Sequence, residues 1–132
     1  MAVRKYSRKR DAILECVRST TEHPAAEWVY SHLKDKFPDL SLATVYRNLA
    51  MFKDEGLVES LGTVGGIERF DGNTAPHDHF ICTACNAVID FEAPALPDAL
   101  LEQVQTQLGA KLSGYRLHYY GLCRSCKNKK IN

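Results

Sequence analysis

Two Cys-x-x-Cys pairs constrain the fold of this chain more than any other feature. Cys82 and Cys85 form the first pair, and Cys123 and Cys126 form the second near the end of the sequence. Four thiolates suit a closed tetrahedral zinc site that leaves no position open for chemistry. Two disulfides are the main alternative, but they need an oxidising compartment. The pairs therefore predict a structural zinc ion that brings two distant segments together.

A second group of candidate ligands surrounds the first cysteine pair. If Pro76 to Cys82 is a β-strand, His77 and His79 share one face and Asp78, Phe80 and Cys82 share the other. Asp71 and Asp90 flank this stretch in the sequence, at separations that allow each to lie on a neighbouring strand. Nitrogen and carboxylate ligands together suit Fe(II), Mn(II) or zinc. Both histidines could equally be polar strand residues, so residue types alone leave this second site open.

Composition sets only broad limits on the 132-residue chain. It is long enough for one domain or two small ones, and 45% hydrophobic residues allow a packed core. We find no apolar run of transmembrane length and no signal-peptide pattern, which predicts a cytoplasmic protein. The net charge of +1 does not by itself indicate nucleic-acid binding. A basic arm precedes Asp11, and it is either a solvated terminus or a contact to DNA phosphates; it comprises Arg4, Lys5, Arg8, Lys9 and Arg10.

The N-terminal half reads as three helices followed by a hairpin. Ser7 is a candidate N-cap for the first helix, His23-Pro24 opens the second with Pro24 in its first turn, and Ser41 caps the third, which ends at Gly56. Strands at 57–61 and 67–70 flank a glycine-rich turn at 62–66. This order predicts a winged helix-turn-helix. On local grounds His23 is a capping or exposed residue.

The third helix carries polar and basic side chains outside its apolar face. That pattern is typical of a recognition helix, whose early residues meet bases and phosphates, although an ordinary amphipathic helix has the same periodicity. The candidate DNA contacts on this helix are Ser41, Thr44, Tyr46, Arg47 and Asn48.

The C-terminal half predicts a small α/β domain. Residues 72–76 are rich in Gly, Asn and Pro and form the best linker in the chain. We therefore expect a winged-helix domain at 1–71, a hinge at 72–76 and a second domain at 77–132, which gives an α+β fold. The second domain is predicted to contain strands at 77–82, 87–91 and 115–120 and a helix at 97–108. One helix on a small sheet leaves an apolar face exposed, which predicts a homodimer.

The ordered motifs HPAAEWVY, SLATVYRNL, ERFDG, HDHFICTACNAVIDF and CRSC resemble the Fur family of metal-dependent transcriptional repressors. The resemblance covers nearly the full chain. It implies a homodimer with an N-terminal winged helix, a C-terminal dimerisation domain with the four cysteines on zinc, and no enzymatic activity. It also implies a regulatory Fe(II) or Mn(II) site and assigns His23 to it, against the local reading; the implied ligands are His23, Asp71, His77, His79 and Asp90.

Within that family the sequence is most similar to the peroxide-sensing PerR branch. Iron-sensing Fur proteins usually have Glu where this chain has Asp71 and Asp90, and many have a further His where this chain has Pro76. The resemblance implies that Fe(II) with peroxide oxidises a ligand imidazole, at His23 or His77, and that Mn(II) occupies the site without this reactivity. Candidates for a further metal site are Asp78, Glu92 and His118.

The resemblance also implies a mechanism. A metal that joins ligands on both sides of the linker would fix the two recognition helices for an operator, and metal loss or ligand oxidation would release them. We expect Tyr46 at a thymine methyl, Arg47 on phosphate or base, and Arg10 with the basic arm on the backbone or minor groove. An iron- or manganese-responsive repressor is the nearest alternative. A Cys-x-x-Cys thiol oxidoreductase and a zinc-ribbon interaction module are remote ones.

Overall fold

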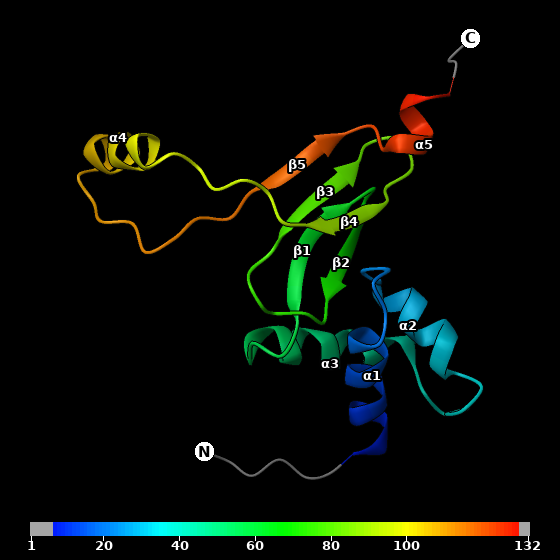
Figure 1. Cartoon of the computed structure of the whole chain (residues 1–132). Helices are drawn as coiled ribbons and strands as arrows, with labels where there is room; N and C mark the ends of the chain where they lie inside the picture. Colours follow the sequence, from blue (N-terminus) through cyan, green and yellow to red (C-terminus); the bar gives the residue numbers. More distant parts are fainter. Residues whose placement is uncertain (1–6, 130–132) are drawn as a thin grey trace. The chain divides into compact units, whose positions relative to one another are not determined.

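The computed structural model describes residues 7–129, and the chain divides into two compact units, Met1–Ala75 and Pro76–Asn132. The basic arm residues Arg4 and Lys5 lie outside the described part of the chain. Figure 1 shows the order of the elements. Among residues 7–129, the first unit holds three helices and a two-stranded sheet, and the second holds a three-stranded sheet and two helices.

Three helices form the base of the first unit: α1 (Arg8–Arg18), α2 (Ala26–Leu33) and α3 (Leu42–Asp54). The predicted caps of α1 and α3 are confirmed, because Ser7 Oγ accepts the backbone N–H of Arg10 at 3.2 Å and Ser41 Oγ accepts that of Thr44 at 3.1 Å. Each cap satisfies a backbone donor that the first helical turn leaves unpaired.

The start of α2 differs from the prediction. The helix begins at Ala26, so Pro24 lies ahead of the N-cap, Ala25, rather than in the first turn. The Pro24 carbonyl accepts the backbone N–H of Phe70 at 2.9 Å, and His23 has a positive φ of 54°. A contact from a distant strand thus fixes this loop, and local sequence could not reveal it.

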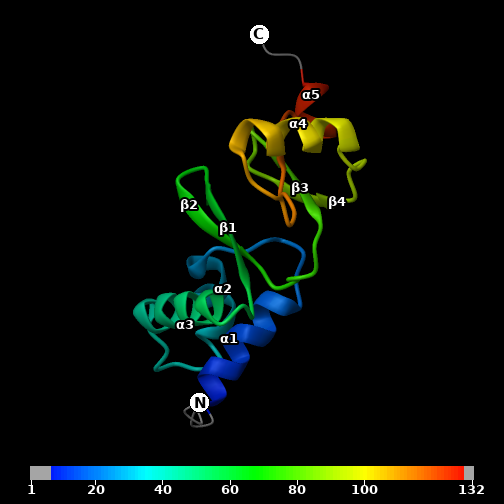
Figure 2. The same ribbon diagram turned by 90° about the vertical axis from the view of Figure 1, so that its left-hand side faces the viewer.

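A hairpin of β1 (Glu59–Val64) and β2 (Ile67–Asp71) completes the first unit and projects from the helices (Figure 2). The predicted turn at 62–66 was too long. Gly62 lies inside β1, where the pairing register shifts between Ser60 and Thr63, and the turn itself falls at Gly65 and Gly66, both with positive φ. A glycine within a strand commonly marks such a bulge.

One apolar cluster holds the helices and hairpin of the first unit together. Burial of each Val, Leu, Ile or Phe side chain in this cluster contributes about 1.5–3 kcal/mol, and the helical positions recur at the spacing expected of one buried face. The least exposed members, at 0–1% of their surface, are Ile13, Val17, Ala26, Val29, Val45, Leu49 and Phe52. Phe70 adds a contact from β2 and is 3% exposed.

The second unit is built on a sheet of order β4-β3-β5. The central strand β3 (Asp78–Cys82) pairs antiparallel with β4 (Val88–Phe91) and parallel with β5 (His118–Gly121). The parallel pair requires a long crossover, which contains α4 (Asp98–Leu108). The predicted third strand, 115–120, was placed too early because pairing with β3 starts only at His118.

Two helices of different kinds complete the second unit. Two extended segments connect α4 to the sheet, and α4 projects away from it without burying any of its residues (Figure 1). The short helix α5 (Arg124–Lys127) follows Cys123 and includes the buried Cys126. In the described part of the chain no helix combines the length and the apolar character needed to cross a membrane.

Candidate metal centres and DNA-binding helix

The four paired cysteines meet in the second unit, as their spacing predicts. Their sulfur atoms all lie within 4.8 Å of one another, and Cys85 Sγ is 3.9 Å from Cys123 Sγ. Cys82 ends β3 and Cys123 follows β5, so the parallel pairing of these strands brings the two Cys-x-x-Cys pairs together. This donor set and closeness fit a tetrahedral zinc ion.

Backbone N–H groups aimed at sulfur prepare this cluster for a cation. Cys82 Sγ accepts the backbone N–H of Cys123 at 3.4 Å and that of Cys85 at 3.5 Å, and these bonds lower the pKa of Cys82 to about 6. Backbone hydrogen bonding likewise lowers the pKa of Cys123. Hydrogen bonding with Cys123 and then Cys82 raises the pKa of Cys126 to about 12. Lower pKa values at Cys82 and Cys123 favour the thiolate, which is the form of cysteine that binds a divalent cation.

The fifth cysteine takes no part in this cluster. Cys16 lies on α1 and packs partly buried against the core of the first unit. Burial raises the pKa of its thiol. It therefore behaves as a small apolar side chain, as its helical context predicts.

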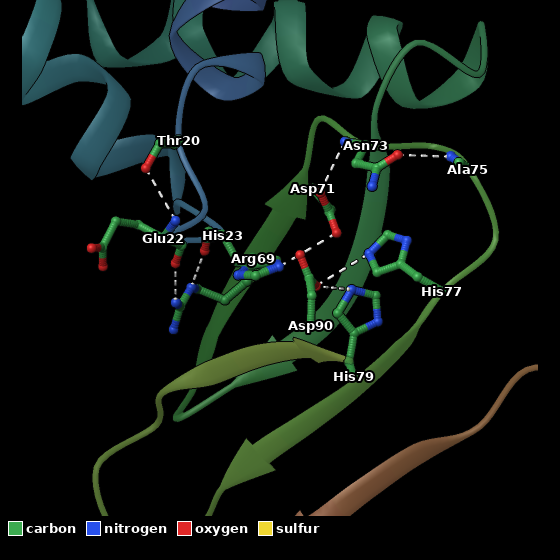
Figure 3. A network of polar contacts seen from close by, with 10 residues as sticks. All are labelled: Thr20, Glu22, His23, Arg69, Asp71, Asn73, Ala75, His77, His79 and Asp90. Atoms are coloured by element: carbon green, nitrogen blue, oxygen red, sulfur yellow. Dashed lines mark hydrogen bonds and ion pairs between the residues drawn. The ribbon is translucent and has the colours of Figure 1, made fainter. Parts of the chain in front are cut away.

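Two of the predicted regulatory ligands come together in the first unit. His23 Nε2 lies 3.4 Å from Asp71 Oδ2, and both side chains are buried. The other carboxylate oxygen, Asp71 Oδ1, accepts the backbone N–H of Asn73 at 2.9 Å, which orients the carboxylate (Figure 3). The local prediction of a capping or exposed His23 is wrong, because the side chain is only 2% exposed and the N-cap of α2 is Ala25.

The other three predicted ligands come together in the second unit. His77 Nε2 lies 3.2 Å and His79 Nε2 3.1 Å from the same oxygen, Asp90 Oδ1 (Figure 3). The register explains this, because His79 and Asp90 are directly opposite each other on β3 and β4. Two imidazole nitrogens and one carboxylate oxygen thus converge, and lone pairs in this arrangement suit a divalent cation. We call these three residues the β3–β4 cluster.

The residues considered for a further metal site have different surroundings. Asp78 Oδ2 accepts the backbone N–H of Ala93 at 3.0 Å, so this carboxylate fastens the end of β4. The His118 ring stacks edge-on against His79 with centroids 5.5 Å apart. Burial, followed by the charge of His79, lowers the pKa of His118, which favours a neutral imidazole. Glu92 is exposed next to Phe91.

The predicted recognition helix presents its polar residues as an ordered group at its N-terminus. Ser41 Oγ lies 2.8 Å from Thr44 Oγ1, which in turn accepts Arg47 Nη2 at 3.2 Å. Asn48 Nδ2 donates to the Thr44 carbonyl at 2.8 Å. Ser41, Tyr46 and Arg47 are exposed, and Tyr46 retains 45% of its surface. Arg10 is half-buried on α1, so it is less available than the residues of α3.

Sequence reasoning missed two residues that support these groups. Glu27 on α2 accepts the hydroxyl of Tyr46, and this hydrogen bond raises the pKa of Tyr46. Arg69 on β2 donates to the backbone carbonyls of His23 and Glu22. Arg69 stands inside the ERFDG motif, so its position was visible in the sequence although its partners were not.

A winged helix joined to a thiolate cluster and to paired histidine and aspartate side chains defines a metal-binding protein of the winged-helix DNA-binding class. The sequence profile of the ferric uptake regulator family matches residues 2–120. The chain therefore belongs to the ferric uptake regulator (Fur) family, whose members are regulators of transcription.

Individual relatives agree with this assignment. The chain is similar to the peroxide operon regulator of Bacillus subtilis (strain 168), with 41% identity over 123 residues that cover 92% of this chain and 83% of the relative. It is also similar to the iron-containing structure of the ferric uptake regulator from Francisella tularensis, with a TM-score of 0.80 and 31% identity over 94% of this chain and 95% of that one. The Campylobacter jejuni peroxide stress regulator gives a TM-score of 0.69 and 28% identity over 89% and 88% of the two chains.

Proposed function

We propose that this protein is a metal-dependent repressor that responds to peroxide. The observation that carries the proposal is the pairing of each candidate ligand histidine with an aspartate, His23 with Asp71 and both His77 and His79 with Asp90. Aspartate at both positions, together with relatives named as peroxide regulators, favours this function over iron sensing. The nearest alternative is a Fur-like iron- or manganese-responsive repressor that uses the same residues.

The regulatory metal site is proposed to contain His23, Asp71, His77, His79 and Asp90. The first two ligands belong to the unit that ends at Ala75, and the other three belong to the unit that follows. When bound, Fe(II) supplies the one-electron chemistry that converts peroxide into an oxidant beside its own ligands, and Mn(II) lacks that reactivity. His23 and His77 are the imidazoles expected to gain an oxygen atom. Loss of either ligand would uncouple the two units.

The remaining parts of the proposal assign the two units their roles. Residues 1–71 would form the DNA-binding domain, 72–76 the hinge, and 77–132 the dimerisation domain with zinc on Cys82, Cys85, Cys123 and Cys126. Two copies would place two α3 helices on one operator. The candidate DNA contacts are Arg10, Ser41, Thr44, Tyr46, Arg47 and Asn48. Such a repressor works without enzymatic turnover, and in the cytoplasm, where thiolates stay reduced.

Operator binding before and after peroxide tests the proposal. The zinc-loaded protein is charged with Fe(II) or with Mn(II), treated with a low dose of hydrogen peroxide, and assayed for operator binding and for the mass of the peptides that contain His23 and His77. We expect the Fe(II) form alone to lose binding, with one added oxygen on either histidine. If binding depends on metal but survives peroxide with both histidines unmodified, the protein is a metal-responsive repressor instead.

A further inference from the structure

Strand β2 holds three successive carbonyls of the loop that carries His23. Arg69 Nη2 donates to the Glu22 carbonyl at 2.7 Å, and Arg69 Nε donates to the His23 carbonyl (Figure 3). The backbone N–H of Phe70 donates to the next carbonyl, that of Pro24, at 2.9 Å. A guanidinium that binds two neighbouring carbonyls through its fork fixes their relative orientation as well as their position.

The backbone of His23 needs such support. Its φ of 54° lies in the left-handed region, which residues with a side chain rarely adopt. The following helix offers little local help, because its N-cap is Ala25, which has no side-chain oxygen to cap α2. Contacts from the distant strand are therefore what maintain this conformation, and the conformation sets the direction of the imidazole.

We propose that Arg69 is a positioning residue that holds the His23 imidazole in place as a metal ligand. Arg69 and Asp71 are two residues apart on β2, so their side chains leave the strand on the same side. One strand then supplies a carboxylate ligand directly and orders the backbone of the histidine next to it, whose Nε2 lies 3.4 Å from Asp71 Oδ2. This inference rests on the proposed regulatory site.

Positioning and simple electrostatics make opposite predictions for Arg69. The guanidinium is a positive charge bonded to the backbone of a candidate ligand, so by Coulomb repulsion alone its removal would tighten binding of a divalent cation. If Arg69 orders His23, its removal weakens that binding instead. The sign of the change therefore separates the two effects.

The test compares Arg69→Met and Arg69→Lys with the parent and with Arg18→Met, which removes an exposed arginine from the same unit. The full-length, zinc-loaded protein is titrated with Mn(II). We expect Arg69→Met to raise the Kd for Mn(II) by about 10- to 100-fold, as is usual when the partner that orients a ligand is lost. Arg69→Lys keeps the positive charge and can still donate a hydrogen bond to one of the two carbonyls, so its affinity for Mn(II) should lie between those of the parent and Arg69→Met. Arg18→Met should bind Mn(II) as the parent does.

Hydrogen exchange on the same proteins without Mn(II) gives a readout that does not depend on the metal. We expect faster exchange in the segment 20–25 of Arg69→Met and unchanged exchange around Phe52 in the core. A parent-like or lower Kd in Arg69→Met would overturn the inference, and if this variant fails to fold, a parent-like Kd in Arg69→Lys would do so. If the parent itself binds no Mn(II), the proposed function fails, and unchanged exchange in 20–25 would separately refute the role of Arg69.

Discussion

Gly72 illustrates how a single residue controls the geometry next to a candidate ligand. It follows Asp71 directly, and its backbone passes close to the end of α1. A Cβ atom at this position would lie 2.7 Å from Arg18 Cα, 2.9 Å from Arg18 N and 2.9 Å from the Val17 carbonyl oxygen. All three are backbone atoms of a packed helix, so they cannot move aside easily.

We therefore predict that Gly72→Ala destabilises the protein. Overpacking of this kind costs about 1–3 kcal/mol, and urea unfolding followed by circular dichroism would measure the loss. Gly114→Ala is the matched control, because a Cβ added at Gly114 meets no atom within 4 Å. Equal stability of the two variants would show that the end of α1 can yield.

The sequence predicts the role of a residue when that role depends on neighbours in the chain or on the type of metal-ligand atom that the residue carries. Ser7 and Ser41 cap their helices as expected, and the cysteine pairs converge as expected. Local sequence failed for His23, whose surroundings depend on β2 and which only the family resemblance assigned to the site, and for Arg69, whose partners are 46 and 47 residues away. No local pattern encodes a contact across that distance.

At the scale of elements, α2 and α3 are joined by a polar contact at the surface that reads DNA in the proposed function. The Tyr46 hydroxyl donates to Glu27 Oε1, and Tyr46 is otherwise exposed. This bond limits the rotation of the ring. A ring held in one rotamer loses less entropy when it packs against a base.

We predict that Glu27→Ala, which leaves the Tyr46 hydroxyl without this acceptor, weakens operator binding by about fivefold, close to the ~1 kcal/mol of a typical hydrogen bond. The reason is the freed Tyr46 ring, so the same substitution in a Tyr46→Phe background should have almost no effect. Fluorescence anisotropy with the operator measures all four proteins of this double-mutant cycle. An equal loss in both backgrounds would mean that Glu27 does not act through Tyr46, and a gain in both would mean that its negative charge repels the DNA phosphates.

Element boundaries show a second limit of sequence reasoning. Helices α1 and α3 were predictable because caps and apolar periodicity agree, whereas α2, which has no side-chain cap, begins later than Pro24 suggests. The observed strand boundaries differ from the predicted ones where hydrogen-bonded pairing decides them. β1 continues through Gly62, and β5 starts at His118 although large side chains alternate from Tyr115. The sequence does not predict the helix α5, because four residues are too few to show a helical period.

The whole molecule is expected to be a dimer, and α4 is where this expectation is best tested. None of its residues is buried, and Leu108 keeps 64% of its surface. An isolated helix of 11 residues is marginal in water. Leu101, Val104 and Leu108 lie on one side of the helix at spacings of three and four, which a second copy could cover.

We predict that Val104→Glu raises the dimer dissociation constant by about 100-fold, because an unpaired carboxylate at an apolar contact costs about 3 kcal/mol. Sedimentation velocity at micromolar concentration would reveal monomers. Glu102→Gln changes charge on the same helix without touching the stripe, so it should remain dimeric. A Val104→Glu protein that stays fully dimeric would place the interface elsewhere.

The central strand of the second unit has a consequence for how this sequence can change in length. His79 and Cys82 are three residues apart on β3. The pairing of β3 with β4 places His79 opposite Asp90, and its pairing with β5 places Cys82 beside Gly121, close to the second cysteine pair. Because side chains alternate, inserting or deleting one residue between them turns one of the two to the opposite face. No re-pairing of the strand can then restore the thiolate cluster and the β3–β4 cluster together. The register of β3 therefore fixes the spacing between His79 and Cys82, whereas it sets no such limit on the length of the segments that connect α4 to the sheet.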